Sequence, residues 1–263
     1  MDYYTQNPQA YKKFLEYGAE KEEETKYLEK AIPSHLKSRL DKLESEGWNV
    51  LDIGCGEGSL TIWLIQYLRS IGPVRCTALD PAANQLQELA EAAERIAFQD
   101  ITCLPLKWEE YRLEQEHDFV ICSHAFYYVK DWETGIQKIL DALTEGGKAM
   151  ISMQAPDNLS YRMGEKFRDR LNPEGRYLLT SASDLSRFLS DQAIPHTVDK
   201  GFYPLDLREA KKLSPSGIKL LEFYLADLWE DVPETMREEV VAYIRSLPDV
   251  LENEVGHIWF TRH

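Results

Sequence analysis

Residues 48–59 read Trp-Asn-Val-Leu-Asp-Ile-Gly-Cys-Gly-Glu-Gly-Ser, and this stretch decides the fold of the chain. The apolar run before the glycines predicts a buried strand, and the apolar spacing after them predicts a helix. Gly54, Gly56 and Gly58 carry no Cβ, so the backbone between strand and helix can approach a ligand closely. The N-terminus of the helix also presents N–H groups that have no partner within the helix. The stretch therefore predicts a ligand site at the end of the first core strand.

The spacing of the glycines narrows the class of ligand. A dinucleotide fingerprint needs G-x-G-x-x-G and a phosphate-binding loop needs Gly-Lys-Ser/Thr, whereas this loop reads G-x-G-x-G without a lysine. Asp52 precedes the loop and Glu57 lies inside it. Carboxylates at these positions repel a pyrophosphate and attract a cation. We expect a cationic nucleoside; an NAD-dependent oxidoreductase is the least favoured alternative, and an ordinary strand–turn–helix without a ligand is the other.

Two further acids follow predicted strands. The strand predicted over 74–79 leads into Asp80, and an acid at the end of the second strand of an α/β unit is placed to hold ribose hydroxyls. The run 95–99 is predicted as the third strand and leads into Asp100, where the amino group of an adenine would lie. Each acid alone is ordinary at a strand end, but three acids in register with the glycine loop indicate a nucleoside site.

Strands and helices alternate along the core, which predicts an α/β fold: a doubly wound, seven-stranded, mostly parallel sheet of the Rossmann-like kind. Ligands of such folds bind at the carboxyl ends of the strands. We predict strands over 48–53, 74–79, 95–99, 118–123, 147–153, 197–202 and 256–261, the last antiparallel. We predict helices over 59–70, 82–94, 108–114 and 132–144.

The rest of the chain is predicted to form one compact unit with this core. Residues 1–46 are helical and charged, and helices before the first strand of this fold commonly cover the ligand site as a lid. That placement makes Tyr3, Tyr4, Tyr11 and one glutamate of the run at 20–24 candidates for substrate contact. We assign 47–155 and 195–263 to the cofactor-binding core. We assign 156–250, which is partly helical, to an insertion on the substrate side.

The loop after the fourth predicted strand contains residues that can take part in catalysis or in substrate binding. His124 follows the predicted strand 118–123 and has the side chain whose ordinary pKa lies near neutrality, so it suits proton transfer or the orientation of a nucleophile. A hydrogen-bonded structural histidine is the equal alternative. Tyr127 and Tyr128 can form the wall of an apolar pocket or stabilise a cation through their ring faces. One of these two tyrosines is expected to serve packing alone.

The amino-acid composition limits which binding partners and which cellular compartment can be expected for this protein. The net charge of −15 argues against a nucleic-acid substrate, whose phosphates require a basic face, and favours a cationic small molecule. Four cysteines without a C-x-x-C pair are typical of buried thiols in a reducing cytoplasm rather than of disulfides or metal ligands. We predict no metal site. No apolar run approaches the length needed to span a bilayer, so no membrane association is expected.

Together the glycine loop, Asp80 and Asp100 resemble the nucleoside-binding signature of class I S-adenosylmethionine-dependent methyltransferases. The resemblance covers about residues 48 to 153 and is fairly specific for the cofactor, S-adenosyl-L-methionine. The predicted cofactor contacts are Asp52, Gly54, Cys55, Gly56, Gly58, Asp80, Pro81, Gln85, Asp100, Ile101 and Ser123.

In finer detail the chain resembles the histamine N-methyltransferase family. Residues 11–20 are similar to the first helices of that family without a gap, which places Glu20 at the glutamate that holds the amine-bearing part of the substrate. Residues 80–85 match its ribose-binding segment and put Gln85 at a further cofactor contact. Residues 126–131 are similar to the loop that supplies its aromatic wall. The resemblance thus spans most of the chain and is loosest over the predicted insertion.

The departures from that family concern the substrate. Asn253 and Glu254 fall where the family has a substrate-binding asparagine, with Glu254 at the position itself, and His124 replaces a glutamine. Leu159 and Met163 stand near the tryptophans that line the pocket of the family. The resemblance therefore implies the reaction more strongly than it implies histamine, and a small amine or amino-acid-like metabolite is the expected class.

The expected function is methyl transfer to nitrogen by in-line displacement. Positioning of the two reactants can supply ~7–11 kcal/mol of the barrier, so the protein needs a base only to remove a proton. The predicted catalytic residues are His124 and Glu20. The predicted substrate contacts are Tyr11, Glu20, His124, Tyr127, Tyr128, Asn253 and Glu254. An O- or C-methyltransferase and a non-catalytic cofactor-binding module remain as alternatives, and the oligomeric state is left open.

Overall fold

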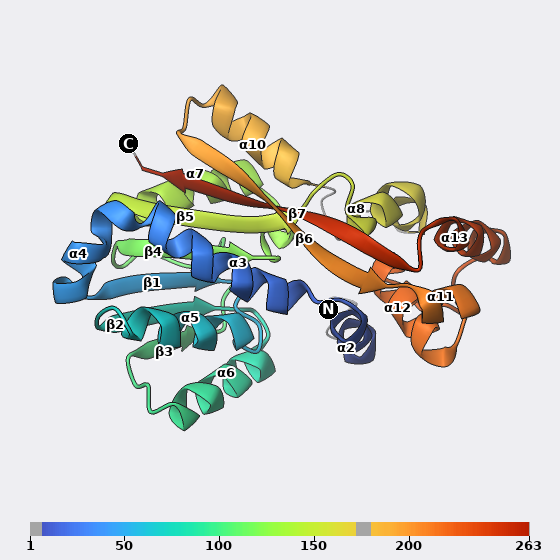
Figure 1. The fold of residues 1–263 in the computed structure, drawn as a ribbon, viewed down its shortest axis with the longest axis horizontal. Helices are drawn as coiled ribbons and strands as arrows, with labels where there is room; N and C mark the ends of the chain where they lie inside the picture. The colour runs from blue at the N-terminus through green and yellow to red at the C-terminus, as the bar shows by residue number, and fades with distance from the viewer. Residues whose placement is uncertain (1–6, 172–179, 263) are drawn as a thin grey trace. The chain divides into compact units, whose positions relative to one another are not determined.

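The computed structural model describes residues 7–171 and 180–262; Tyr3 and Tyr4 lie outside these ranges. Its strands form one seven-stranded sheet in the order β3-β2-β1-β4-β5-β7-β6 (Figure 1). The strands are β1 Trp48–Ile53, β2 Val74–Leu79, β3 Ile101–Leu104, β4 His117–Ser123, β5 Leu143–Gln154, β6 His196–Asp206 and β7 Val250–Thr261.

Helices stand between the strands along the chain. In the first half they are α2 Pro8–Tyr17, α3 Glu20–His35, α4 Lys37–Glu46, α5 Ser59–Arg69, α6 Ala83–Arg95, the 3-10 helix η1 Phe126–Tyr128 and α7 Trp132–Ala142. In the second half they are α8 Leu159–Met163, the π-helix η2 Gly164–Arg168, α9 Asp169–Leu171, α10 Ala182–Asp191, α11 Arg208–Lys212, α12 Pro215–Leu225 and α13 Glu234–Ser246. None of the helices within the described ranges combines the length and apolarity needed to cross a bilayer.

The central strands are parallel, as predicted. β1 pairs in parallel with β2 and β4, while β2 pairs with β3 and β4 pairs with β5 in the same sense. Figure 1 shows β7 running opposite to β5. The prediction of a doubly wound, mostly parallel seven-stranded sheet is therefore confirmed. Because the strands are parallel, the ends of β1, β2 and β4 lie at one edge of the sheet, where a ligand site of this fold belongs.

The chain divides into two compact units. Unit 1 contains Met1–Glu24, Gln154–Ser181 and Lys200–Val255, and unit 2 contains Thr25–Met153, Ala182–Asp199 and Gly256–His263. The sequence predicted one compact unit with boundaries after residues 46 and 155. In the structure, α4 and α10 both group with unit 2, so the predicted lid and the predicted insertion are each shared between the units. Their roles over the substrate stay predictions.

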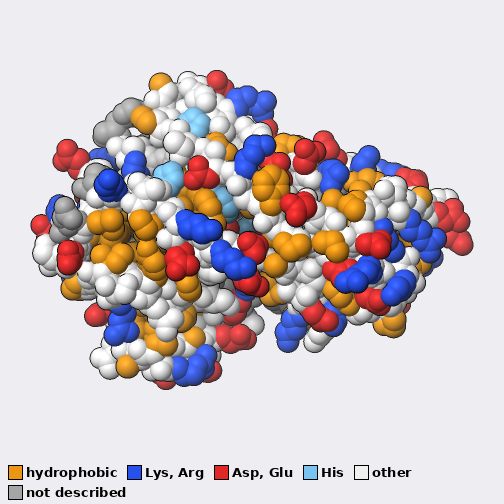
Figure 2. Space-filling model, in the orientation of Figure 1, with side chains coloured by type: hydrophobic (Ala, Val, Ile, Leu, Met, Phe, Trp, Pro, Cys, Tyr) orange, Lys and Arg blue, Asp and Glu red, His pale blue; other side chains and the backbone are white. Residues whose placement is uncertain are grey.

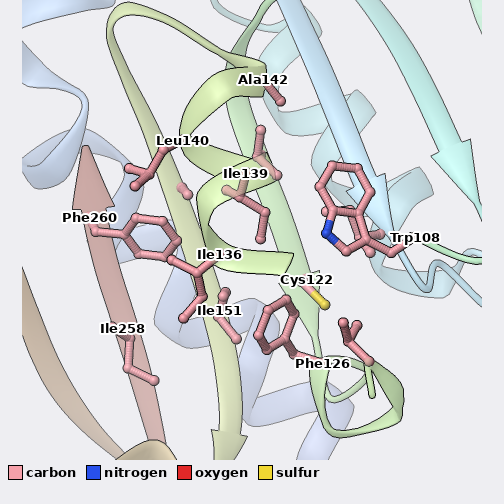
Figure 3. Close-up of a cluster of buried hydrophobic side chains, with 14 of the residues drawn as sticks. Trp108, Cys122, Phe126, Ile136, Ile139, Leu140, Ala142, Ile151, Ile258 and Phe260 are labelled. Atoms are coloured by element: carbon pink, nitrogen blue, oxygen red, sulfur yellow. The ribbon is translucent and has the colours of Figure 1, made fainter. Parts of the chain in front are cut away.

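Unit 2 has a hydrophobic core on each face of its strands. Side chains of a β-strand alternate between faces, so Leu51 and Ile53 of β1 join one cluster and Val50 joins the other. Figure 3 shows the first cluster, where side chains of α7, β4, β5 and β7 meet around Ile136 and Ile151. Burial of this apolar surface is the main source of stability, at roughly 25 cal/mol for each Å² removed from water.

Unit 1 has its own core, which is rich in aromatic rings. The ring of Phe14 on α2 stacks on that of Phe223 on α12 at 4.3 Å between centroids and contacts Tyr203 and Tyr224 edge-on. These are the offset and edge-to-face arrangements that aromatic pairs prefer. The apolar stripe of α2 thus packs on α12, which explains why the N-terminal residues group with this unit.

The predicted third strand is wrong. Residues 96–98 form the C-terminal cap of α6 instead, because the N–H groups of Ala97 and Phe98 donate to the carbonyls of Glu94 and Ala93. This is a Schellman motif, with Ala97 in the left-handed conformation (φ 51°) where a glycine is usual. The apolar alternation of Ile96 and Phe98 that suggests a strand serves this cap, since Phe98 is buried. The strand itself begins later, at Ile101.

The predicted helix over 108–114 is also wrong, because this segment forms a turn stabilised by its buried aromatic rings. Trp108 and Tyr111 are both buried, with ring centroids 5.9 Å apart, and the indole N–H of Trp108 donates to the carbonyl of Gly135 at 3.0 Å. The apolar spacing that suggests a helix therefore reflects packing on α7. The strands predicted over 48–53 and 74–79 coincide with β1 and β2, and the other predicted elements are present with shifted ends.

A buried ion pair fixes α4 to the opposite edge of the sheet. The guanidinium of Arg39 lies 2.5 Å from the carboxylate of Asp118 and also donates to the carbonyl of Glu145. Asp118 accepts two more hydrogen bonds, from the N–H of Asn49 at 3.0 Å and the hydroxyl of Thr144 at 3.1 Å. Because both charges are buried, each depends on the other for compensation.

We predict that Arg39→Met destabilises the protein by about 3–5 kcal/mol, since it leaves the Asp118 carboxylate buried without its cation. Chemical unfolding followed by circular dichroism measures the change. Lys42→Met is the matched control on the same helix, because the pair of Lys42 with Glu46 is exposed and is expected to contribute about 0.5 kcal/mol. Equal losses for the two variants would contradict the role given to Arg39.

Candidate functional site

The glycine loop follows β1 in the conformation that its sequence requires. Gly54, Gly56 and Gly58 all have positive φ, at 74°, 56° and 81°. The N–H groups of Gly54 and Cys55 donate to the carbonyl of Leu79, the last residue of β2. The loop is therefore tied to the end of the neighbouring strand, and α5 begins directly after Gly58, which caps it in the left-handed conformation.

Two of the glycines are required by what packs against them. A Cβ on Gly58 would lie 2.3 Å from the side chain of Leu89 on α6, and a Cβ on Gly54 would lie 2.3 Å from the methyl group of Ala125. At Gly56 a Cβ would meet Gln85 Oε1 at 3.1 Å. The sequence assigns all three glycines to ligand approach, whereas the structure shows that Gly54 and Gly58 also let the loop after β4 and helix α6 pack against the glycine loop.

Asp80, at the end of β2, shapes the same loop. Its carboxylate accepts the N–H of Gly56 at 3.0 Å and the N–H of Ala82 at 2.8 Å. Burial raises the pKa of Asp80, these two N–H donors lower it, and the charge of Glu57 raises it again. The carboxylate therefore sits between the glycine loop and the start of α6, at the edge of the sheet where the sequence predicted it.

Asp52, near the end of β1, is buried with 3% of its surface exposed. The hydroxyl of Thr61 on α5 donates to its carboxylate at 2.6 Å. The pKa of Asp52 is raised to about 7: burial raises it most, the hydrogen bond from Thr61 opposes this rise, and the charge of Asp80 adds to it. Two carboxylates that repel each other thus occupy one partly desolvated site.

This arrangement fits a cationic nucleoside. A cation relieves the repulsion between Asp52 and Asp80, and hydroxyl groups are natural donors to a carboxylate that already orients a loop. A diphosphate would add negative charge beside the buried Asp52 and the half-buried Asp80, which is unfavourable. Cys55 does not add charge, because burial raises the pKa of its thiol. The donor set and its charge therefore match the predicted class of ligand.

Asp100 and Ile101 do not join this group. Asp100 directly precedes β3, its carbonyl accepts the N–H of Cys76 near the start of β2, and its side chain is exposed. Asp100 therefore lies toward the amino end of the strand, away from the edge that carries Asp80. Ile101 packs with the apolar side chains of α6. Their expected placement beside an adenine rested on the strand predicted over 95–99, which the structure replaces by a helix cap.

The structure also places the other predicted contacts on α6 and its approach. Pro81 is exposed and directly follows Asp80. Gln85 is half-buried on the first turn of α6, where its amide faces Gly56. Gln85 thus joins Asp80 and the glycine loop in one cluster, and its contact with a cofactor stays a prediction.

The loop after β4 holds His124 in a strained conformation. Its φ of 52° is uncommon for a residue with a side chain and costs about 1–3 kcal/mol. The N–H of His124 donates to the carbonyl of Ser152 on β5 at 3.0 Å, and the next residue, Ala125, contacts Gly54. Ser123 ends β4 and is half-buried. His124 therefore lies beside the glycine loop, where the sequence predicted it.

Tyr127 and Tyr128 follow in η1, with ring centroids 4.7 Å apart at 52°. Tyr127 packs against the cluster of buried side chains around Phe126, whereas Tyr128 is 41% exposed. Figure 3 shows Phe126 pointing into that cluster and so anchoring the loop. The pair thus divides into one packed ring and one exposed ring, and the predicted roles of the two in substrate binding stay predictions.

The remaining predicted substrate residues lie in unit 1. Glu20, at the first turn of α3, is half-buried, and its charge contributes to raising the pKa of the buried Tyr203 on β6. The hydroxyl of Tyr203 accepts a hydrogen bond from the amide of Asn253 at 3.0 Å. Glu20, Tyr203 and Asn253 therefore form one polar group within an otherwise apolar core.

Asn253 and Glu254 lie within β7, so the prediction that both precede the strand is wrong. Asn253 is fully buried, and its amide oxygen also accepts the N–H of Leu159 at the start of α8. Glu254 pairs with Lys200 at 2.8 Å. Successive side chains of a strand point to opposite faces, so these two cannot contact one substrate from the same side. Asn253 positions Tyr203 and α8.

Tyr11 lies on α2, where its ring packs within 6.3 Å of Phe14 and 6.1 Å of Phe223, measured between centroids. The ammonium group of Lys21 stands 5.7 Å from its ring centroid, in a cation–π geometry. Tyr11 is therefore part of the aromatic core of unit 1 and already interacts with a cation.

Two residues that contact predicted site residues, Thr61 and Tyr203, were not predicted from the sequence. Thr61 lies in the first turn of α5, on the face that packs on β1. Because the glycine loop brings the start of this helix back to the end of β1, the contact of Thr61 with Asp52 could have been predicted from the sequence. Tyr203 carries no such signal, because its contact with Asn253 depends on how β6 and β7 pair. The spacing of residues along the chain therefore predicts the contact of Thr61 with Asp52, but it cannot predict the contact of Tyr203 with Asn253.

A methyltransferase domain family matches residues 6–192 of this chain, which covers most of it. Among curated relatives, (S)-coclaurine N-methyltransferase of Thalictrum flavum subsp. glaucum is 21% identical over 154 residues, 57% of this chain. Malonyl-[acyl-carrier protein] O-methyltransferase of Acetivibrio thermocellus is 28% identical over 125 residues, 48% of this chain. The match spans 42% of each of these two relatives, less than half of their length.

A solved structure of coclaurine N-methyltransferase, bound to N-methylheliamine and SAH, shares the fold. Its TM-score is 0.53 at 18% identity, with 87% of this chain and 71% of that chain covered. The chain therefore belongs to the methyltransferase domain family. Within it, the chain has the Rossmann-like methyltransferase fold that the sequence predicts. The finer likeness to the histamine N-methyltransferase family stays a prediction.

We predict that Asp52 makes the stability of the ligand-free protein depend on pH. Its pKa of about 7 in the folded state exceeds the ordinary value of 3.8, so between these values the folded protein binds more protons than the unfolded chain. Stability therefore falls as the pH rises from about 4 to about 7 and levels off above. Asp52→Asn should remove this fall and stabilise the protein by about 4 kcal/mol at pH 8, with little effect at pH 4, because each unit between the two pKa values corresponds to ~1.4 kcal/mol.

Thermal unfolding at the two pH values measures this prediction. Asp100→Asn is the control, because Asp100 is exposed, and it should leave the difference between pH 4 and pH 8 as in the unmodified protein. An Asp52→Asn variant whose stability follows the same pH profile as the unmodified protein would show that Asp52 is not the group that titrates.

Proposed function

We propose that this protein transfers a methyl group from S-adenosyl-L-methionine to the nitrogen of a small amine or amino-acid-like metabolite. The proposal of this cofactor rests on two carboxylates beside the left-handed glycine loop, the buried Asp52 and the half-buried Asp80. The observation that favours an amine is the half-buried Glu20 carboxylate beside Tyr203 and Asn253. Both fit a cationic nucleoside and a cationic acceptor better than they fit anions.

The chain holds the cofactor through the residues of unit 2. Asp80 binds the ribose hydroxyls, Gln85 and the glycine loop line the nucleoside, and Asp52 compensates the positive charge. When bound, S-adenosyl-L-methionine supplies a methyl group activated by its cationic sulfur. Because the donor arrives activated, the protein needs mainly to orient the reactants and exclude water, and this can supply ~7–11 kcal/mol of the barrier.

Glu20 and His124 serve the acceptor. The Glu20 carboxylate binds the amine-bearing part of the substrate, as the resemblance to the histamine N-methyltransferase family implies. His124, with its strained backbone at the end of β4, removes the proton that the amine must lose. Tyr127 and Tyr128 line the acceptor side of the loop.

The coclaurine enzyme among the relatives is an N-methyltransferase, which supports nitrogen as the target, while the malonyl-carrier enzyme is an O-methyltransferase. The net charge of −15 favours a cationic acceptor. On the face that Figure 2 shows, acidic and basic side chains are interspersed rather than separated by sign. The attraction of an amine is therefore assigned to Glu20 rather than to a broad acidic surface.

We predict that Asp80→Asn raises the Kd for S-adenosyl-L-methionine by about 10-fold to 100-fold, because charged hydrogen bonds to hydroxyls contribute about 1.5–3 kcal/mol. Isothermal titration calorimetry measures the affinity. Asp100→Asn is the matched control and should bind as the unmodified protein does, since Asp100 lies toward the other end of its strand. If Asp100→Asn weakens binding and Asp80→Asn does not, the site is wrongly placed.

We predict that Glu20→Gln raises KM for the amine acceptor at least about 10-fold, since it removes the charge that pairs with the ammonium group. A thermal-shift screen of small amines with S-adenosylhomocysteine supplies the acceptor. Glu22→Gln is the control, because Glu22 is exposed in the same turn of α3. Equal KM values for the two variants would remove the proposed role of Glu20.

Tandem mass spectrometry of the product locates the methyl group. A methyl group on nitrogen supports the proposal, and a methyl group found only on oxygen or carbon contradicts it. A protein that binds the cofactor and turns over no amine, hydroxyl or protein acceptor would be a cofactor-binding module.

A further inference from the structure

We infer that Thr61 is a positioning residue for cofactor binding: its hydroxyl holds the Asp52 carboxylate in the charged form and in the orientation that receives the cationic ligand. This inference rests on the proposed function, because Asp52 must bind the cofactor for its orientation to matter. Nothing in the glycine-loop signature itself assigns a role to Thr61.

The geometry of the two side chains is that of a buried, charge-assisted hydrogen bond. Thr61 Oγ1 lies 2.6 Å from a carboxylate oxygen of Asp52, and the exposed fractions of the two residues are 1% and 3%. A hydroxyl donating to a carboxylate at this distance is among the stronger hydrogen bonds of proteins. At such burial, losing the donor is costly, because no bulk water replaces it.

Asp52 has less support than its neighbour. Asp80 accepts two backbone N–H groups, whereas in the described part of the chain the donor to the Asp52 carboxylate is the Thr61 hydroxyl. The two carboxylates repel each other, and burial disfavours the charge of both. Thr61 therefore supplies the stabilisation that backbone groups give to Asp80.

The other groups that face Asp52 do not replace Thr61. They are the thiols of Cys55 in the loop, Cys76 on β2 and Cys122 on β4, together with the Asp80 carboxylate. Burial raises the pKa of each thiol, so all three stay neutral at physiological pH. Asp80 opposes ionisation of Asp52. The Thr61 hydrogen bond is thus the contact in this group that favours the charged form.

Thr61→Val tests the inference, since valine keeps the shape of threonine and removes the hydroxyl. Calorimetric titration with S-adenosyl-L-methionine between pH 6 and pH 9 is expected to show an affinity at least about 10-fold weaker at pH 7, with most of the loss recovered at pH 9. The pH at which affinity is half-maximal should move upward. Thr61→Ser, which retains the hydroxyl, should bind as the unmodified protein does across this range.

A direct measurement accompanies the affinity. Carbon-13 NMR of the aspartate carboxyl groups in the cofactor-free protein, assigned with Asp52→Asn, should show Asp52 titrating at higher pH in Thr61→Val than in the unmodified protein. An unchanged Asp52 titration, or an affinity lowered equally at all pH values, would mean that Thr61 only packs α5 on β1 and would overturn the inference.

Asp52→Asn separates this inference from the proposed function. If Asp52→Asn binds S-adenosyl-L-methionine as tightly as the unmodified protein, Asp52 is not part of the cofactor site and the assignment on which the inference rests fails. If Asp52→Asn binds weakly at every pH, adding Thr61→Val should weaken binding no further. A further loss of 3-fold or more in that background would show that Thr61 acts independently of Asp52, and the inference would fail alone.

Discussion

The site depends on two carboxylates of like charge at the ends of adjacent parallel strands. The parallel register of β1 and β2 pairs Asp52 with Ala78, so Asp80 follows just beyond it at the same edge. Burial raises the pKa of both carboxyl groups, and nearby negative charge raises them further: that of Asp80 acts on Asp52, and that of Glu57 acts on Asp80. The Thr61 hydroxyl compensates Asp52, and the N–H groups of Gly56 and Ala82 compensate Asp80. In the proposed function, the cationic cofactor completes the compensation.

Packing against the glycine loop fixes its shape. Leu89 of α6 closes on Gly58 and Ala125 closes on Gly54, each at a distance that no Cβ could share. The neighbouring residue, His124, has a strained backbone with a φ of 52°. This conformation turns the chain at the end of β4, so that Ala125 contacts Gly54. Strain at one residue thus holds the candidate proton acceptor beside the cofactor loop, and the cluster around Phe126 maintains it.

In unit 1, Asn253, which the resemblance assigns to substrate binding, makes hydrogen bonds within the protein core. Asn253 lies in β7 with its amide committed to Tyr203 and to the start of α8, so it organises the group that contains Glu20. Glu254, at the position that the resemblance assigned to the substrate, points to the other face and pairs with Lys200. Because successive side chains of a strand point to opposite faces, Asn253 and Glu254 have different surroundings although they are adjacent in the sequence.

The sequence by itself determined the parallel core and the positions of the glycine loop, Asp52 and Asp80, because strand–turn–helix order and glycine spacing are local properties. Tertiary structure alone decided which side chains support them. Asp100 was misplaced because a helix cap with Ala97 in the glycine position has the apolar alternation of a strand. The pairing of Asn253 with Tyr203 could not be predicted either, since it joins residues fifty positions apart whose register is set only when β6 and β7 assemble.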